Sequence, residues 1–409
     1  MVKFLLKVYS TSALAPVCDL LLAYYLFKRL TVEDVGIYSE LSAYLVLALV
    51  LLDGQLSVLL VRICGGKGER FLLGLKSVVG QRVNAIALGV LVIFAGALIH
   101  SGYISLYLMI AGIALLTVAD STLVTYFRVK LSNSVANFFV GLNGLLRLIG
   151  ALTFTVFFEL NILSFTIGIL IAKIVYFTIV CCVVIPKVRK EKKSSETRLS
   201  LLEGIEQGSY MTASALSAAE NRLDWFIIGA LLGPKQLATY VLGNKVFEVS
   251  KMVVGIGMTN VFPHLSHNNE ARGFYVGMFS IVMVMAVAVS LVANTIESHF
   301  GTEKYFGAAG VIVLFMLVSP LSALVGFIYQ QAMLINRYRA FLYSSALAVM
   351  LQAVINYVFI PVYGIFVAPL SMGTSWALII FGAFFYIPNI NKPACLCVIG
   401  ISALLSTYC

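Results

Sequence analysis

Apolar stretches of about 20 residues recur along this chain, and they limit its fold more than any other feature. Residues 103–125 and 276–296 are two of them, and their apolar character covers all sides of a helix without alternating. A helix needs about 20 apolar residues to span a bilayer, whereas a spanning barrel strand shows about ten alternating ones. Hydrophobic residues make up 61% of the chain and charged residues only 11%. The sequence therefore predicts an all-α, polytopic membrane protein.

About twelve spans fit along the chain, and a polar stretch near its midpoint separates six from six. The two halves share a layout in which Leu30 corresponds to Leu232 and Tyr38 to Tyr240, as in transporters built from repeated lobes. The predicted spans are residues 8–27, 36–60, 78–99, 103–126, 135–158 and 162–185, then 209–232, 240–262, 274–296, 308–334, 341–360 and 366–387. We expect an N-terminal six-helix lobe (1–185), a cytoplasmic linker (186–208), a C-terminal six-helix lobe (209–387) and an apolar segment (388–409). That last segment crosses the membrane, lies in its interface or packs on a neighbour.

Lysine and arginine are distributed unevenly between the predicted loops, and this sets the orientation of the helices. Loops that stay in the cytoplasm accumulate these residues, and most of the 28 lysines and arginines fall on the side that holds the N-terminus. The opposite loops hold only Lys28, Arg29, Lys235 and Lys304. We therefore place the N-terminus in the cytoplasm. The excess of basic residues indicates how the helices are oriented in the membrane and that they contact anionic membrane lipids, rather than nucleic acid.

Several charged residues fall inside the predicted spans, where lipid is a poor environment for them. Each would cost about 3 kcal/mol at the bilayer centre, so most must face a watery interior or pair with one another. Residues near span ends, such as Glu40, Arg82 and Lys173, can instead extend toward the interface. The basic members are Arg82, Arg147, Lys173, Arg222, Lys245 and Lys251, and the acidic ones are Asp19, Glu40, Asp53, Asp120, Glu220, Asp224 and Glu248.

Helical spacing places many of these residues on shared polar faces. In the eighth span, Asn244, Glu248, Lys251 and Gly255 follow one another at intervals of four, three and four residues, and Lys245 lies beside them. The other two polar faces are Ser214, Ser217, Glu220, Asn221 and Asp224 in the seventh span, and Asn137, Gly141, Gly144 and Arg147 in the fifth. The glycines let a substrate or another helix come close. Together these faces predict the walls of one central polar cavity.

A cavity with basic residues suits a ligand that carries phosphate or acidic sugar groups. Buried carboxylates add a second capability, because they can exchange a proton or bind sodium and so couple transport to an ion gradient. Asp224 lies near Arg222 in sequence and Glu248 near Lys245, so each carboxylate can neutralise a base or release it. The candidate substrate-binding residues are Arg147, Lys173, Arg222, Lys245, Lys251, Asn137 and Asn244, and the candidate ion-coupling residues are Asp224, Glu248, Asp120, Asp53 and Glu220. We predict no cofactor, metal site or catalytic residue.

Two other interpretations of the charged residues are open. Ion pairs such as Lys245 with Glu248, or Arg222 with a neighbouring carboxylate, can simply lock helices together. An enzyme is the second alternative, because Glu33 and Asp34 are similar to the acidic pair of some membrane glycosyltransferases and O-antigen polymerases. The chain has no P-loop, GxSxG or HExxH motif, and its longest predicted outer loop is short for such enzymes.

Three segments carry motifs that are typical of one family of membrane transporters. Residues 52–62 read LDGQLSVLLVR; residues 221–229 read NRLDWFIIG, with LGP at 232–234 and Tyr240 after them; Asn356 precedes PVYGI at 361–365. In these motifs and in layout the chain resembles the O-antigen (Wzx-type) translocases. These are the polysaccharide-biosynthesis flippases of the multidrug/oligosaccharidyl-lipid/polysaccharide exporter superfamily. The chain departs from the family at Ala238 and Val367, where glycine is usual.

The resemblance implies a fold of two six-helix lobes that alternates between inward-open and outward-open states. It implies a cargo, undecaprenyl-pyrophosphate-linked oligosaccharide, that moves from the cytoplasmic to the periplasmic leaflet of the bacterial inner membrane. Glycan polymerase and chain-length machinery are implied partners. Multidrug exporters share this fold and are the alternative, although the intramembrane bases favour an anionic cargo.

Overall fold

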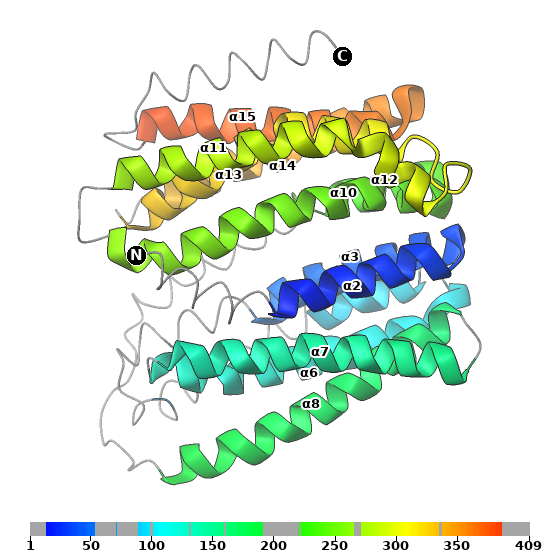
Figure 1. The fold of residues 1–409 in the computed structure, drawn as a ribbon, viewed down its shortest axis with the longest axis vertical. Helices are drawn as coiled ribbons and strands as arrows, with labels where there is room; N and C mark the ends of the chain where they lie inside the picture. The colour runs from blue at the N-terminus through cyan, green and yellow to red at the C-terminus, as the bar shows by residue number, and fades with distance from the viewer. Residues whose placement is uncertain are drawn as a thin grey trace. The chain divides into compact units, whose positions relative to one another are not determined.

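In a computed structural model of the chain, every described residue lies in a helix or in a short connection. The described residues are 14–53, 71, 89–98, 101–130, 132–158, 161–190, 220, 222–265, 271–334 and 338–386. The helices, most of them labelled in Figure 1, are α2 (Leu14–Arg29), α3 (Val32–Asp53), η2 (Ser101–Tyr103), α6 (Ile104–Val129), α7 (Asn133–Phe157), α8 (Ile162–Lys190), α10 (Leu223–Leu265), α11 (Ala271–Leu291), α12 (Ala293–Phe300), α13 (Ala308–Leu334), α14 (Tyr338–Tyr363), η3 (Gly364–Phe366) and α15 (Val367–Tyr386). A short apolar helix also covers Gly89–Leu98. The predicted all-α class is confirmed.

Six helical segments of the described chain are long and apolar enough to cross a membrane, or seven if the pair α11 and α12 forms one span. That pair is bent by 54°, so the span predicted at 274–296 is broken near Leu291, and its second part continues to Phe300. The polytopic helical architecture is therefore confirmed. The count of twelve stays a prediction, because 8–13, 54–60, 78–88, 191–219 and 387–409 lie outside the described residues.

The chain forms two compact units. The N-terminal unit contains the described residues of 6–30 and 41–218, and the C-terminal unit contains Thr31–Glu40 with the described residues from 219 onward. The first turns of α3 group with the C-terminal unit because Glu33 Oε1 lies 3.2 Å from Lys235 Nζ, and because a Cβ at Gly36 would overlap the backbone of Pro234. The predicted lobe boundaries stay a prediction, since most of the predicted linker and the start of the second predicted lobe, residues 191–219, lie outside the described ranges.

A break at Gly233 divides α10 into two helices that fold back on each other. Gly233 has φ 82° and ψ 175°, a conformation that favours glycine. Residues 26 positions apart on one straight helix would lie about 39 Å apart, since the helix rises about 1.5 Å per residue. Arg222 Nη2 nevertheless lies 3.0 Å from Glu248 Oε1 across this break. Residues 222–232, the described end of the seventh predicted span, therefore form a hairpin with the eighth span.

Helices α6, α7 and α8 pack together in the N-terminal unit. Val129 and Val188, at the C-terminal ends of α6 and α8, belong to one buried apolar cluster. Helices α7 and α8 approach closely through small residues, because a Cβ added at Gly150 would overlap the carbonyl oxygen of Gly168. This packing fixes the three helices that carry the first polar site.

Replacing Gly150 with alanine should destabilise the protein by about 1–3 kcal/mol, because the new methyl group has no room beside α8. Gly112→Ala in α6 is the matched control, since the nearest atom to its new Cβ would be Leu170 Cδ1 at an ordinary 3.5 Å. Thermal unfolding of both variants in one detergent measures the difference. Equal midpoints for the two variants would contradict the close packing of α7 on α8.

Candidate functional site

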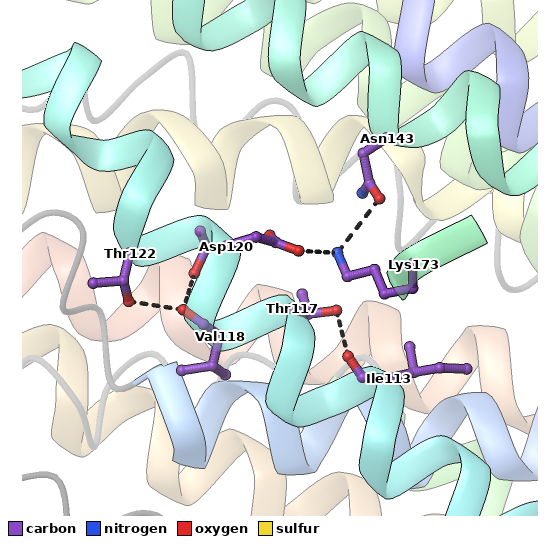
Figure 2. Close-up of polar contacts among 8 residues, drawn as sticks. Ile113, Thr117, Val118, Asp120, Thr122, Asn143 and Lys173 are labelled. Carbon is purple, nitrogen blue, oxygen red and sulfur yellow. Dashed lines mark hydrogen bonds and ion pairs between the residues drawn. The ribbon is translucent and has the colours of Figure 1, made fainter. Parts of the chain in front are cut away.

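A buried ion pair and a hydrogen bond from the same lysine join three helices of the N-terminal unit (Figure 2). Lys173 Nζ of α8 lies 2.6 Å from Asp120 Oδ2 of α6 and 3.4 Å from Asn143 Oδ1 of α7. The Lys173 and Asp120 side chains are only 2% and 6% exposed. Lys173 therefore does not extend toward the membrane interface, because Asp120 draws its ammonium group inward. A predicted substrate-binding residue and a predicted ion-coupling residue thus contact each other and are enclosed by protein.

The polar face of α7 meets α2. A Cβ at Gly141 or Gly144 would press against the first turns of α2, so these glycines admit a helix. Arg147 Nη1 lies 3.1 Å from Asp19 Oδ1 on α2, and the two side chains are 30% and 53% exposed. Asn137, on the same helix, is half-buried. The face predicted to admit either a substrate or a helix therefore holds a helix, with a partly exposed ion pair at its edge.

Two basic side chains share one carboxylate in the C-terminal unit. Glu248 Oε1 accepts a hydrogen bond from Arg222 Nη2 at 3.0 Å, and Glu248 Oε2 accepts one from Lys245 Nζ at 2.6 Å. The side chains of Arg222, Lys245 and Glu248 are 14%, 34% and 32% exposed. The Arg222 guanidinium lies 4.1 Å from the centre of the Trp225 ring, which restrains its plane. This Arg222–Lys245–Glu248 cluster carries one more positive than negative charge.

Asp224 contacts a tyrosine rather than the arginine two residues before it. Its Oδ2 accepts a hydrogen bond from the Tyr240 hydroxyl across the hairpin, and its side chain is fully buried. Arg222 forms its ion pair with Glu248. The prediction that Lys245 pairs with Glu248 is confirmed, whereas the carboxylate that pairs with Arg222 is Glu248 and not Asp224.

Lys251 lies on α10 about one turn beyond the cluster, against aromatic rings. Its Nζ is 5.0 Å from the centre of the Phe247 ring and 5.3 Å from that of Trp376. It interacts electrostatically with Glu220, a buried carboxyl group at the start of the hairpin. The hairpin therefore brings Glu220, from the polar face predicted for the seventh span, close to Lys251, from the polar face predicted for the eighth.

Gln352 of α14 also contacts this site, and a polar pair close to it in α14 joins that helix to α15; the sequence analysis missed both. Gln352 Nε2 donates a hydrogen bond to the carbonyl oxygen of Glu220 at 3.0 Å, and Ser371 Oγ donates one to Asn356 Oδ1 at 2.5 Å. Asn244 Oδ1 and Gln352 Oε1 are buried and find no hydrogen-bond partner among the described residues. The sequence contained a signal for these residues, because Gln352 and Asn356 lie four residues apart in an otherwise apolar span and so share one face of the helix.

Some predicted site residues lie outside the described part of the chain. Asp53 closes α3, but its side chain is not among those described, and Arg82, Asn221, Ser214 and Ser217 fall in undescribed positions. Their roles stay predictions, as does the central cavity.

Long apolar helices that enclose ion pairs and buried carboxyl groups define a helical membrane protein with a polar interior. No protein-family model and no curated protein matches the chain in sequence. A multidrug resistance MATE family transporter of the MOP superfamily, in an outward-facing conformation, matches in structure at 13% identity with a TM-score of 0.63. That match covers 99% of this chain and 96% of the transporter.

Two further solved structures resemble the chain along nearly its whole length. The lipid II flippase MurJ, in an inward closed conformation, is 13% identical with a TM-score of 0.62, over 99% of this chain and 91% of MurJ. A MOP superfamily transporter from Pyrococcus furiosus is 12% identical with a TM-score of 0.60, over 94% of each chain. Identities this low show the fold alone. The chain has the fold of the MOP superfamily transporters, which confirms the predicted exporter-superfamily fold.

Proposed function

We propose that the protein is a flippase for an anionic, lipid-linked oligosaccharide. Its cargo would be an undecaprenyl-pyrophosphate-linked O-antigen or similar unit, moved from the cytoplasmic to the periplasmic leaflet of the bacterial inner membrane. The observation that carries this proposal is the Arg222–Lys245–Glu248 cluster, in which two partly exposed bases share one carboxylate. Excess positive charge at a partly desolvated site favours phosphate and acidic sugar groups.

The other predicted residues have proposed roles around this cluster. Arg147 is partly exposed and can exchange Asp19 for an anionic group of the cargo, and Lys251 can add a third cation beside Glu248. Lys173 reaches the cargo only if α6, α7 and α8 rearrange, because Asp120 encloses it. We assign Asn137 and Asn244 to hydrogen bonds with sugar hydroxyl groups, and Asp224, Glu248, Asp120, Asp53 and Glu220 to coupling with protons or sodium ions. Glycan polymerase and chain-length machinery are proposed partners that receive the product.

Transporters of this fold support both a flippase and an alternative. MurJ is a lipid II flippase, and the MATE protein is a multidrug resistance transporter. In the Pyrococcus furiosus transporter, the reverse polarity of the binding pocket suggests a different function. The fold therefore accommodates different cargoes, and local charge must decide between them. A multidrug exporter is the second candidate, because the buried Glu220 and Asp224 would suit a cationic drug.

In proteoliposomes, combining Arg222→Gln with Lys245→Gln should slow the flipping of lipid-linked oligosaccharide by at least about tenfold, the effect of losing one such bond. The reason is that a hydrogen bond to a charged group contributes roughly 1.5–3 kcal/mol. Lys235→Gln is the matched control, since its exposed side chain pairs with Glu33 away from the cluster. Thermal midpoints of all preparations show whether the variants are folded.

Efflux of a cationic dye on the same preparations tests the alternative. The flippase proposal fails if the wild-type protein exports the dye and does not flip the glycan lipid. It also fails if a folded double variant flips the glycan lipid at the wild-type rate.

A further inference from the structure

The C-terminal ends of α6 and α8 form a basic patch in the N-terminal unit. Residues 128–130 read RVK and residues 187–189 read KVR, so each end places a valine between two cations. Val129 is fully buried and Val188 is 8% exposed. The basic patch consists of the four exposed cations Arg128, Lys130, Lys187 and Arg189. Each helix end thus buries its valine and turns its two charges outward.

The two helix ends lie side by side. Val129 and Val188 belong to the same buried apolar cluster, and Lys187 Nζ of α8 lies 5.1 Å from the ring centre of Phe127 on α6. Lys130 Nζ lies 5.2 Å from the ring centre of Tyr126, also on α6. Lysine side chains laid along aromatic rings keep their ammonium groups at the surface while their stems stay packed. The four cations therefore form one patch rather than two separate ends.

The basic patch lies at the depth of the lipid head groups. Both α6 and α8 are long and apolar enough to span a membrane. Arg128, Lys187 and Arg189 occupy their last turns, and Lys130 directly follows α6. Residues that close a span lie at the boundary between acyl chains and head groups. Within the described ranges, no carboxylate forms an ion pair with Arg128, Lys187 or Arg189. The patch thus presents positive charge to the membrane surface.

We propose that the basic patch binds the phosphate head groups of anionic phospholipids in the adjacent monolayer. This site is separate from the proposed cargo site in the C-terminal unit and does not depend on it. Each lysine or arginine near an anionic membrane surface contributes about a fivefold preference for it, so four of them make a strong combined site. A head group bound there bridges α6 and α8, the two helices that also carry the Lys173–Asp120 pair.

Native mass spectrometry of the purified protein with mixed phosphatidylglycerol and phosphatidylcholine measures how strongly the protein prefers the anionic phosphatidylglycerol. The patch variant carries Arg128→Gln, Lys130→Gln, Lys187→Gln and Arg189→Gln. The matched control carries Lys28→Gln, Arg29→Gln, Lys235→Gln and Lys304→Gln, which changes the net charge equally. The preference for phosphatidylglycerol should fall by at least about tenfold in the patch variant and by less than about twofold in the control. High salt should weaken the wild-type preference.

An unchanged preference in the patch variant, or an equal loss in both, would overturn the proposal. If the patch variant does not fold, Lys187→Gln and Arg189→Gln alone should each lower the preference by about fivefold, and no loss in either would also overturn it. A third arm adds undecaprenyl pyrophosphate at the same concentration. Displacement of phosphatidylglycerol from the patch by this lipid would assign the site to the cargo and contradict the proposal.

Discussion

Replacing Lys173 with methionine should lower the free energy of unfolding by about 3–5 kcal/mol. The substitution leaves the Asp120 carboxylate enclosed among α6, α7 and α8 without the ammonium group that lies 2.6 Å from it. Lys235→Met is the matched control, because Lys235 and Glu33 are 71% and 60% exposed and an exposed pair contributes only about 0–1 kcal/mol. Denaturant or thermal unfolding in one detergent measures both changes. Equal effects of the two substitutions would contradict the burial of the Lys173–Asp120 pair.

A double variant separates the structural role of this pair from a role in transport. Lys173→Met with Asp120→Leu should regain most of the stability, since apolar residues of similar volume often replace a buried ion pair without loss. If the folded double variant still flips lipid-linked oligosaccharide at the wild-type rate, neither residue binds cargo or couples ions. If it is stable and inactive, the pair takes part in transport.

Glu248→Gln and Asp224→Asn should bind lipid-linked oligosaccharide but lose the acceleration of flipping that an imposed pH gradient produces. Glu248 holds both Arg222 and Lys245, so a proton that arrives on it frees two cations for the anionic cargo, and its departure restores the ion pairs. A coupling free energy between two sites typically corresponds to about 5- to 150-fold, so we expect the gradient effect to fall by at least fivefold. Proteoliposome flipping with and without the gradient measures this.

Thermal unfolding of the same preparations tests the competing structural account. If these carboxyl groups are only structural, each substitution should destabilise the protein by about 1–3 kcal/mol through a polar group left without its partner, and should reduce binding and flipping together. If both variants fold normally and respond fully to the gradient, neither carboxyl group is the coupling site. An ion other than the proton, or flipping without ion coupling, would then explain transport better.

The class of the protein and the positions of several described helices followed from the sequence. The spans predicted at 103–126 and 308–334 correspond to α6 (Ile104–Val129) and α13 (Ala308–Leu334). Helix boundaries are predictable here because lipid cannot form hydrogen bonds with the backbone. A backbone segment in lipid must therefore form its hydrogen bonds internally, and a long apolar run does so best as a helix. Helical period also identified the polar faces that carry Lys245, Glu248 and Lys251.

The bend between α11 and α12 and the contribution of α14 to the polar site were not predicted. Both depend on packing against other helices, which leaves little trace in the hydropathy of one segment. Gln352 and Asn356 sit in a run that is otherwise apolar, and their importance is visible only once Gln352 meets the backbone of Glu220.

The sequence by itself determined that this is a helical membrane protein with charged residues at particular positions on its helix faces. Only the tertiary structure decided which of those residues meet across different helices. Arg222 pairs with Glu248 because the chain reverses at Gly233, and Lys173 pairs with Asp120 because α6 and α8 pack side by side. The physical reason is that the helical period fixes the direction in which each side chain leaves its own helix. The partner of a charged side chain on another helix depends on which helix packs against it.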